Sequence, residues 1–427
     1  MKLLIVAIAS SFCLVIFFSK LKYVEHKQRY LAKITSVSDT TPRNPTTVVV
    51  SSIKKKTYNV APYELPPLRI SETFRKGIPK NGAFWNRKKG IPKNGAFWNR
   101  KLHSLLRQFD SADNQTQKGP LDKFNCQPES FELLQTNIQD VRSYPALYGD
   151  FLRGMECRDP PLLIDQPDKC DQIFLLFAIK SIPRHFERRQ AVRETWGRGG
   201  LYENGLQVRT VFLLGRSSAD DPKLDKLVSF EAQQFQDLLV WDFHDSFYNL
   251  TLKEHVFFKW MLDNCPHVSF IFKGDDDVFA NTQAILNHLQ SLEPEQATAL
   301  YTGQIISSAN PLRDPKIKYY VPQSFYEGPY PPYAGGGGFL FSGNLLPSLY
   351  HVSFYIPFFP IDDVYNGMCF KALGIPATKH EGFKTFDIRE QDRENPCVHK
   401  DLLLVHQRNP GQTMRLWRNM HSTMLTC

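Results

Sequence analysis

The sequence predicts an α/β fold in which helices flank a largely parallel β-sheet. Four apolar runs, residues 173–179, 208–214, 268–272 and 402–405, have the continuous hydrophobicity of strands buried on both faces. Between them, residues 251–264 have helical periodicity, because Leu252, Val256 and Trp260 are four apart and share one face. Ligands of such sheets bind beyond the carboxyl ends of the strands, so the residues that follow each run are the candidates for chemistry.

The first 125 residues differ in character from the rest of the 427-residue chain. Leu3–Ser19 is an uncharged apolar run of 17 residues, which predicts a transmembrane signal anchor after a cytoplasmic tail of residues 1–2. A cleaved signal peptide is the alternative, but no clear cleavage site of small residues follows the run. Residues 20–125 are rich in Pro, Thr, Lys and Asn and predict a stem, which leaves residues 126–427 for the folded domain.

The stem contains a tandem duplication, in which the 13 residues Lys76–Lys88 are repeated without change as Lys89–Lys101. Two copies do not make a solenoid, which needs at least three stacking units. The sequence alone therefore assigns this duplication no function.

The net charge of +9 raises the question of a nucleic-acid partner. Residues 1–125 contain 23 Lys and Arg against 7 Asp and Glu, whereas residues 126–427 contain 29 against 36. The basic excess thus lies in the stem, and a nucleic-acid enzyme would need it on the folded domain. We expect no nucleic-acid partner.

Cysteines and glycosylation sequons favour an oxidising, lumenal compartment for the folded domain. Seven of the eight cysteines follow the apolar run, which predicts disulfide bonds and, because seven is odd, one cysteine that is free or intermolecular. Asn114 and Asn249 each begin an Asn-X-Thr sequon and are predicted glycosylation sites. Asn249 has an alternative role as a helix cap.

An acidic turn follows the third apolar run. Asp275, Asp276 and Asp277 are adjacent, and their mutual repulsion makes sense if Mg²⁺ or Mn²⁺ binds there through carboxylate oxygens. The alternative is an acidic surface turn. His406 follows the fourth run, where it either completes a metal site or is structural.

Basic residues follow the first run. Lys180 lies at its end, and Arg189 and Arg193 are four apart on the helix predicted next. Together they could hold a diphosphate, although a solvated basic helix face explains the two arginines equally well.

Two further segments carry candidate residues. Tyr330–Ser342 combines aromatic residues with four consecutive glycines, which let a backbone approach a ligand while aromatic faces stack on sugar rings. Asp362 and Asp363 lie at a probable helix start, where each could cap the helix. Alternatively, one of them acts as a general base.

Seven features, in this order along the chain, resemble glycosyltransferase family 31, and most closely its β1,3-N-acetylglucosaminyltransferases that extend poly-N-acetyllactosamine. They are RRQAVRETWG (188–197), VFLLG (211–215), NLTLK (249–253), KGDDDVF (273–279), YPPYAGGGGFLFSG (330–343), IDDVYNG (361–367) and His406. The resemblance covers residues 126–427 and implies a GT-A-type fold and an inverting transfer from UDP-GlcNAc. It also implies a single-pass type II protein of the Golgi membrane with a lumenal catalytic domain, and leaves a homodimer open.

The resemblance also implies roles for individual residues. The acceptor is a glycan of a glycoprotein or glycolipid, and Asp363 is the base that deprotonates O3 of its terminal galactose. A divalent cation, Mn²⁺ or Mg²⁺, is held by Asp277 and His406. The donor side comprises Lys180, Arg189, Arg193, Asp275 and Asp276, and the acceptor side comprises Asp362, Tyr333, Gly336 and Gly337.

Three alternatives stay open at this point. Within the family, a β1,3-galactosyltransferase using UDP-Gal shares the motifs for metal and base. Outside it, the chain could be a carbohydrate-binding protein without catalysis, or a metal-dependent nucleotide-sugar hydrolase. Products formed with and without an acceptor distinguish them.

Overall fold

The computed structural model describes residues 67–77, 95–111, 128–166, 170, 172–202, 205–218 and 220–427. The chain divides into two units, Met1–Val60 and Ala61–Cys427, and every described residue belongs to the second. The predicted anchor, Leu3–Ser19, and the sequon at Asn114 lie outside the described residues. Within the described ranges, no helix is both long and apolar enough to cross a membrane.

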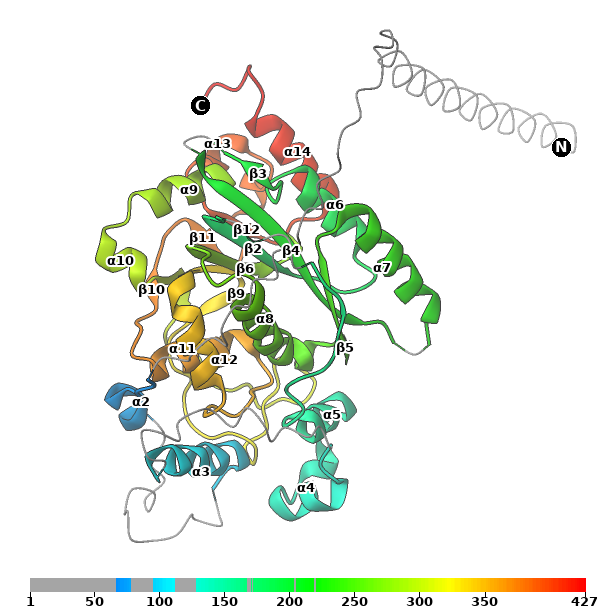
Figure 1. Ribbon diagram of the computed structural model, residues 1–427, viewed down its shortest axis with the longest axis vertical. Helices are drawn as coiled ribbons and strands as arrows, with labels where there is room; N and C mark the ends of the chain where they lie inside the picture. Colours follow the sequence, from blue (N-terminus) through cyan, green and yellow to red (C-terminus); the bar gives the residue numbers. More distant parts are fainter. Residues whose placement is uncertain are drawn as a thin grey trace, which may run out of the picture. The chain divides into compact units, whose positions relative to one another are not determined.

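The second unit is built on a nine-stranded sheet (Figure 1). Its strand order is β1-β5-β4-β2-β6-β9-β8-β10, with β3 paired to β4. The central strands β5, β4, β2 and β6 are parallel, whereas β6, β9 and β8 pair antiparallel, so the sheet has the predicted parallel centre but is mixed overall. The strands are β1 (Leu162–Ile164), β2 (Leu175–Lys180), β3 (Gly200–Leu201), β4 (Gln207–Arg216), β5 (Leu238–His244), β6 (Phe270–Asp275), β8 (Tyr301–Ile306), β9 (Tyr333–Ser342) and β10 (Thr378–Lys379).

A second, smaller sheet lies beside the ends of these strands. It comprises β11 (Phe383–Lys384), β12 (Leu404–His406) and β7 (Val278–Ala280), in the order β11-β12-β7. The prediction that residues 402–405 join the parallel sheet is therefore wrong, because β12 pairs antiparallel with β7. A short apolar run predicts a buried strand, but it does not specify which other strand that strand pairs with.

Helices cover both faces of the main sheet, as predicted. Successive side chains of β2 enter different cores: Leu176 and Ala178 pack with α8, α11 and α12, while Leu175 and Phe177 pack with α6, α7, α9 and α14. The helices are α2 (Glu72–Gly77), α3 (Phe97–Ser111), α4 (Phe131–Asn137), α5 (Ala146–Gly154), α6 (Phe186–Glu194), α7 (Pro222–Phe235), α8 (Leu250–Asn264), α9 (Thr282–Gln290), α10 (Pro294–Thr298), α11 (Leu346–Ser353), α12 (Asp362–Ala372), α13 (Pro396–His399) and α14 (Pro410–Met420).

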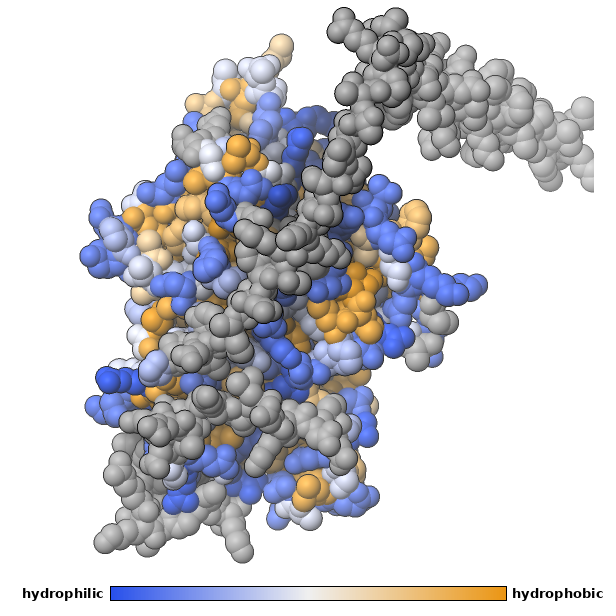
Figure 2. Space-filling view, in the orientation of Figure 1, coloured by the Kyte–Doolittle hydropathy of each residue, from blue (hydrophilic) through white to orange (hydrophobic). Residues whose placement is uncertain are grey.

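The surface in Figure 2 is largely hydrophilic with separate hydrophobic patches. Helix α7 has apolar residues on its buried side and on its exposed side. Its Val228 and Ala232 are buried against the sheet, whereas its Leu227 and Phe230 are 57% and 69% exposed. Helix α7 thus packs on one face of the sheet while leaving apolar side chains exposed on its other side.

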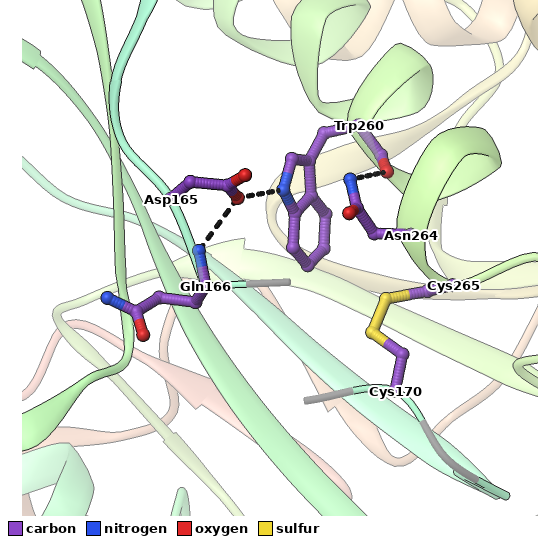
Figure 3. The surroundings of a disulfide bond; sticks show 6 residues. All are labelled: Asp165, Gln166, Cys170, Trp260, Asn264 and Cys265. Atoms are coloured by element: carbon purple, nitrogen blue, oxygen red, sulfur yellow. Dashed lines mark hydrogen bonds between the residues drawn. A yellow bond between two sulfur atoms is a disulfide. The ribbon is translucent and has the colours of Figure 1, made fainter. Parts of the chain in front are cut away.

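The C-terminal end of helix α8 lies beside a disulfide (Figure 3). Its last turn is tied to the segment after β1 by the Cys170–Cys265 disulfide, and the Trp260 indole donates to Asp165 over 2.7 Å. At its other end, the side chain of Asn249 donates to the His244 carbonyl over 2.8 Å and makes no capping bond. The capping alternative for Asn249 is therefore wrong, and its glycosylation stays a prediction.

The described cysteines agree with the prediction of disulfide bonds and one unpaired cysteine. Cys397 and Cys427 form a second disulfide, and Cys157 is disulfide-bonded as well. Among the described residues, Cys369 is the free cysteine, and it is buried in α12. The odd thiol is thus enclosed in the core.

The predicted boundary between stem and folded domain at residue 126 is wrong. Helices α2 and α3 belong to the second unit, and both pack into its main core through Phe74, Leu102 and Leu106. The apolar residues Leu102, Leu106 and Phe109 recur at helical spacing. The predicted boundary rests on the polar composition of the surrounding segment, which does not show this spacing.

The second copy of the duplicated segment begins α3. The Trp98 indole is 2% exposed and donates to the Pro357 carbonyl over 3.0 Å, while Asn99 exchanges hydrogen bonds with the Glu327 backbone. Trp85, the counterpart of Trp98 in the first copy, lies outside the described residues. One copy therefore accounts for all of these docking contacts.

Removal of residues 76–88 should leave the fold intact. The shortened chain has one copy and six residues between the end of α2 and the start of α3, which can span about 20 Å when extended. That length suffices because Gly77 and Trp98 line the same small cavity. We expect a thermal midpoint within about 2 °C of the full chain, measured by calorimetry.

The matched substitutions are Trp98→Ala and Trp85→Ala in the full chain. Loss of a buried tryptophan typically costs about 3–5 kcal/mol, so Trp98→Ala should lower the midpoint sharply and Trp85→Ala should not. Equal destabilisation by the two substitutions would contradict the assignment of the docked copy.

Candidate active site

The acidic turn joins the two sheets. It follows β6 and leads directly into β7, so its side chains lie where the parallel strands end. Asp275 forms an ion pair with the Lys180 ammonium at 3.1 Å, and Asp277 faces the His406 imidazole, with 3.1 Å between Oδ1 and Nε2. The turn thus connects a lysine on one side with a histidine on the other.

Pairing of β12 with β7 positions His406. In this antiparallel register His406 lies opposite Val278, the residue after Asp277. The imidazole Nδ1 is 2.9 Å from the Thr385 carbonyl, so Nδ1–H donates there and Nε2 is directed at the acids. Burial opposes protonation, but the hydrogen bond and charge of Asp277 raise the pKa of His406.

Asp275, Asp277 and His406 could hold a metal ion. One ligand atom from each lies within 4.8 Å of the others. Two carboxylates and an imidazole oriented by a backbone carbonyl suit a divalent cation such as Mn²⁺ or Mg²⁺. The sequence prediction for Asp277 and His406 therefore agrees with their geometry, and Asp275 joins them.

Lys180 is buried between two acids rather than facing a ligand. Its side chain is 7% exposed, and its ammonium donates to Asp362 over 2.7 Å and to the Gly336 carbonyl over 3.3 Å, besides contacting Asp275. Burial alone would lower the pKa of Lys180, but the charges of Asp275 and Asp362 raise it well above its usual value. The ammonium therefore links β2, β6, β9 and α12.

Asp362 and Asp363 begin α12 and have opposite environments. Neither occupies the cap position, which is Ile361 and has no side-chain capping bond, although the Asp363 carboxylate accepts from the Val364 amide of the first turn. Burial disfavours the charge of Asp362, but the Lys180 charge and hydrogen bond lower its pKa. Burial and then the charge of Asp362 raise the pKa of Asp363 to about 7. The two adjacent carboxyls thus differ in charge near neutral pH.

The predicted acceptor role of Asp362 conflicts with this arrangement. Its side chain is 8% exposed and is held by Lys180, so it offers a ligand little accessible surface. Asp363 instead accepts from the Gly336 amide over 3.1 Å and from the Val364 amide over 2.8 Å. Asp362 is thus held by Lys180, whereas the Asp363 carboxyl is held by two backbone amides.

The predicted glycine-rich loop is strand β9 over most of its length. Its glycines run between α12 and the smaller sheet, where a Cβ on Gly336 would lie 3.3 Å from Asp363 Oδ2 and one on Gly337 would lie 3.3 Å from the His406 ring. A Cβ at either position would therefore be in tight contact with these side chains, because both approach the backbone closely. Asp363, the candidate base, and His406, a candidate metal ligand, therefore both lie against the glycines of β9.

Tyr333 begins β9 and is largely buried. A Cβ on Gly367 would lie 2.5 Å from its Cβ, so Tyr333 packs closely on α12, and burial raises its pKa. Of the residues predicted to border the acceptor, Gly336 lies against Asp363, and contact of Tyr333, Gly336 and Gly337 with an acceptor stays a prediction.

Arg189 and Arg193 do not face the acidic turn, so their predicted contact with a donor is wrong. The fully buried Arg189 forms a bidentate pair with Glu231 of α7, at 2.9 and 2.6 Å. Arg193 pairs with the same Glu231 and with Asp237, which precedes β5. These pairs hold α6 against α7 and occupy the guanidinium groups of both Arg189 and Arg193.

Asp276 is also structural rather than exposed to a donor. Its side chain is 5% exposed and accepts from Ser181 over 2.6 Å and from His185 over 2.8 Å. Arg188 completes this set, with Nη1 3.1 Å from Asp276 and 3.0 Å from Asp277. Sequence analysis missed Arg188 and His185, although Arg188 begins the first quoted motif and is the neighbour of Arg189.

A buried ion pair beneath the site was also missed. Lys273 of β6 and Glu254 of α8 are each 1% exposed and 2.5 Å apart. Glu254 accepts from Asn366 of α12 over 3.2 Å. Lys273 could have been singled out from the sequence, because it is the first residue of the KGDDDVF motif. Glu254 could not, because the residues around it in α8 have the pattern of an ordinary buried helix.

Comparison with known proteins adds to this geometry. A sequence model of the family described as Galactosyltransferase matches residues 187–381. The mouse protein N-acetyllactosaminide β-1,3-N-acetylglucosaminyltransferase 2 is 48% identical over 305 residues, which are 71% of this chain and 76% of that protein. The human protein of the same name is 47% identical over the same shares of both chains.

More distant relatives agree. The rat protein UDP-GlcNAc:betaGal β-1,3-N-acetylglucosaminyltransferase 7 is 42% identical over 66% of this chain and 72% of its own. The alignment with a solved galactosyltransferase structure, LgtC with donor and acceptor sugar analogues, covers 58% of this chain and 96% of that one, at 10% identity and a TM-score of 0.30. The α/β fold with a central sheet flanked by helices is the one expected from the resemblance. The chain therefore belongs to glycosyltransferase family 31, the galactosyltransferase family that includes the β1,3-N-acetylglucosaminyltransferases.

Proposed function

We propose that this enzyme transfers N-acetylglucosamine from UDP-GlcNAc to O3 of a terminal β-galactose on N-acetyllactosamine-type glycans, with inversion, and so builds poly-N-acetyllactosamine. One observation carries the chemistry: Asp363 and the group Asp275, Asp277 and His406 flank the same glycine strand. The names of the relatives support the choice of donor and acceptor.

Asp275, Asp277 and His406 would hold the divalent cation. When bound, it neutralises the charge that develops on the leaving diphosphate. The chain's own contribution is to fix the ligands: the Thr385 carbonyl orients the imidazole, and Lys180 holds Asp275.

Asp363 would act as the general base. The acceptor O3–H gives its proton to the Asp363 carboxylate as O3 forms a bond to C1 of the α-linked sugar. The bond from C1 to the diphosphate oxygen breaks on the opposite side, which yields a β-linked product. The Gly336 and Val364 amides, which hydrogen-bond both Asp363 oxygens, keep the carboxyl in one orientation.

We also propose that the protein is anchored in the Golgi membrane by residues 3–19, with the catalytic domain lumenal. The disulfides at Cys170–Cys265 and Cys397–Cys427 support an oxidising compartment. Glycosylation at Asn114 and Asn249 belongs to the same proposal.

Product analysis tests the proposed reaction. Purified enzyme is incubated with an N-acetyllactosamine acceptor and, separately, UDP-GlcNAc, UDP-Gal or UDP-GalNAc, and NMR identifies the new linkage. We expect a β1,3-linked N-acetylglucosamine from UDP-GlcNAc alone, abolished by chelation and restored by Mn²⁺ or Mg²⁺. A galactosylated product would instead assign a β1,3-galactosyltransferase, and free sugar formed without acceptor would assign a hydrolase.

The pH dependence tests the base. Because Asp363 must be ionised to accept a proton and its pKa is about 7, kcat/KM should rise about tenfold per pH unit below 7 and level off above it. Asp363→Asn removes the acceptor of the proton and should lower kcat by about 10²–10⁴-fold.

Asp362→Asn is the matched variant. It removes the like charge that raises the pKa of Asp363, so the acidic limb of the profile should move to lower pH. An active Asp363→Asn enzyme, or a limb that Asp362→Asn leaves in place, would refute the assignment of the two aspartates.

A further inference from the structure

Arg188 occupies an unusual position among the basic residues around the acidic turn. Its guanidinium contacts Asp276 and Asp277 through the same nitrogen, Nη1. Its side chain is 35% exposed, compared with 7% for Lys180 and 0% for Arg189. Arg188 is therefore much more accessible to solvent than Lys180 or Arg189.

The two carboxylates that Arg188 contacts differ in their burial and in their other hydrogen-bond partners. Asp276 accepts from Ser181 and His185 on its other oxygen and is almost fully buried, so it is a fixed anchor. Asp277 is 25% exposed and is one of the three candidate metal ligands. Its Oδ2 faces Arg188 and its Oδ1 faces His406. A cation that binds Asp277 must therefore compete with Arg188 for it.

We propose that Arg188 couples binding of the divalent cation to binding of the donor diphosphate. In the absence of the cation, Arg188 neutralises Asp277. When the cation takes Asp277, Arg188 loses that partner, stays tethered to Asp276, and offers its free N–H donors to the diphosphate. The inference rests on the proposed metal site, and it assigns to Arg188 a role that Arg189 and Arg193 were expected to have.

The physical basis is competition between like charges. A guanidinium and a divalent cation both stabilise Asp277, but together on one carboxylate they repel each other. An anionic diphosphate relieves this repulsion, because guanidinium groups bind phosphate oxygens strongly and with two parallel hydrogen bonds. Each ligand should then strengthen the other by the same factor.

Binding measurements on the full-length enzyme test this. Free Mn²⁺ is counted by electron paramagnetic resonance, with and without saturating UDP, for wild type and Arg188→Gln. For wild type, we expect UDP to tighten Mn²⁺ binding by a factor within the usual range for coupled sites, roughly 5–150. Arg188→Gln should bind Mn²⁺ alone about three- to tenfold more tightly, and its coupling factor should fall at least about fivefold.

Arg184→Gln is the matched control, since Arg184 is an exposed arginine four residues earlier and its loss changes the net charge equally. It should match wild type within about twofold in both measurements. Arg188→Lys provides the same comparison if the glutamine variant is unstable, because an ammonium lacks the planar fork and should weaken the coupling less.

The outcomes separate this inference from the proposed function. Wild type that binds no Mn²⁺ even with UDP would refute the metal site itself. Wild type that binds both cooperatively, with Arg188→Gln unchanged in Mn²⁺ affinity and coupling, would refute only the role of Arg188.

Discussion

The active site depends on the buried ammonium of Lys180. It joins the end of β2 to Asp275 of β6, to the backbone of β9 and to Asp362 of α12, so four elements meet at one charge. Removing one partner of such a buried pair typically costs about 3–5 kcal/mol, because the other charge is left uncompensated. The same contact affects the chemistry. Against the effect of burial, the charge and hydrogen bond of Lys180 lower the pKa of Asp362, and burial together with the charge of Asp362 raises the pKa of Asp363 to about 7.

Two further buried ion pairs, Lys273–Glu254 and Lys253–Asp245, support this arrangement. The Lys273–Glu254 pair links β6 to α8, and the bond from Asn366 to Glu254 links α8 to α12. The residue of α8 before Glu254, Lys253, donates to the Ser181 carbonyl and pairs with Asp245. Buried ion pairs add little net stability, but their geometry restricts how elements pack. We interpret these pairs as what fixes the orientation of α12 relative to the acidic turn.

Sequence analysis predicted the parts of this site that local pattern encodes. Continuous apolar runs located β2, β4 and β6, and acids at a strand end identified Asp275 and Asp277. The distinction between Arg188 and Arg189 could not be predicted, because neighbours on a helix point about 100° apart and the buried face is chosen by Glu231, which is distant in sequence. Likewise, nothing local to Asp362 and Asp363 reveals that Lys180 contacts only the first of them.

The central claim is that Lys180 divides the two adjacent aspartates into a permanent anion and a base with a pKa near neutrality. The most direct measurement is a carboxyl ¹³C NMR titration of aspartate-labelled enzyme, with the two resonances assigned from Asp362→Asn and Asp363→Asn. The account predicts that Asp363 titrates near pH 7 while Asp362 stays ionised until below its usual range, although strongly interacting carboxyls titrate partly as a pair. Titration of Asp363 near 4, or protonation of Asp362 around neutral pH, would contradict it.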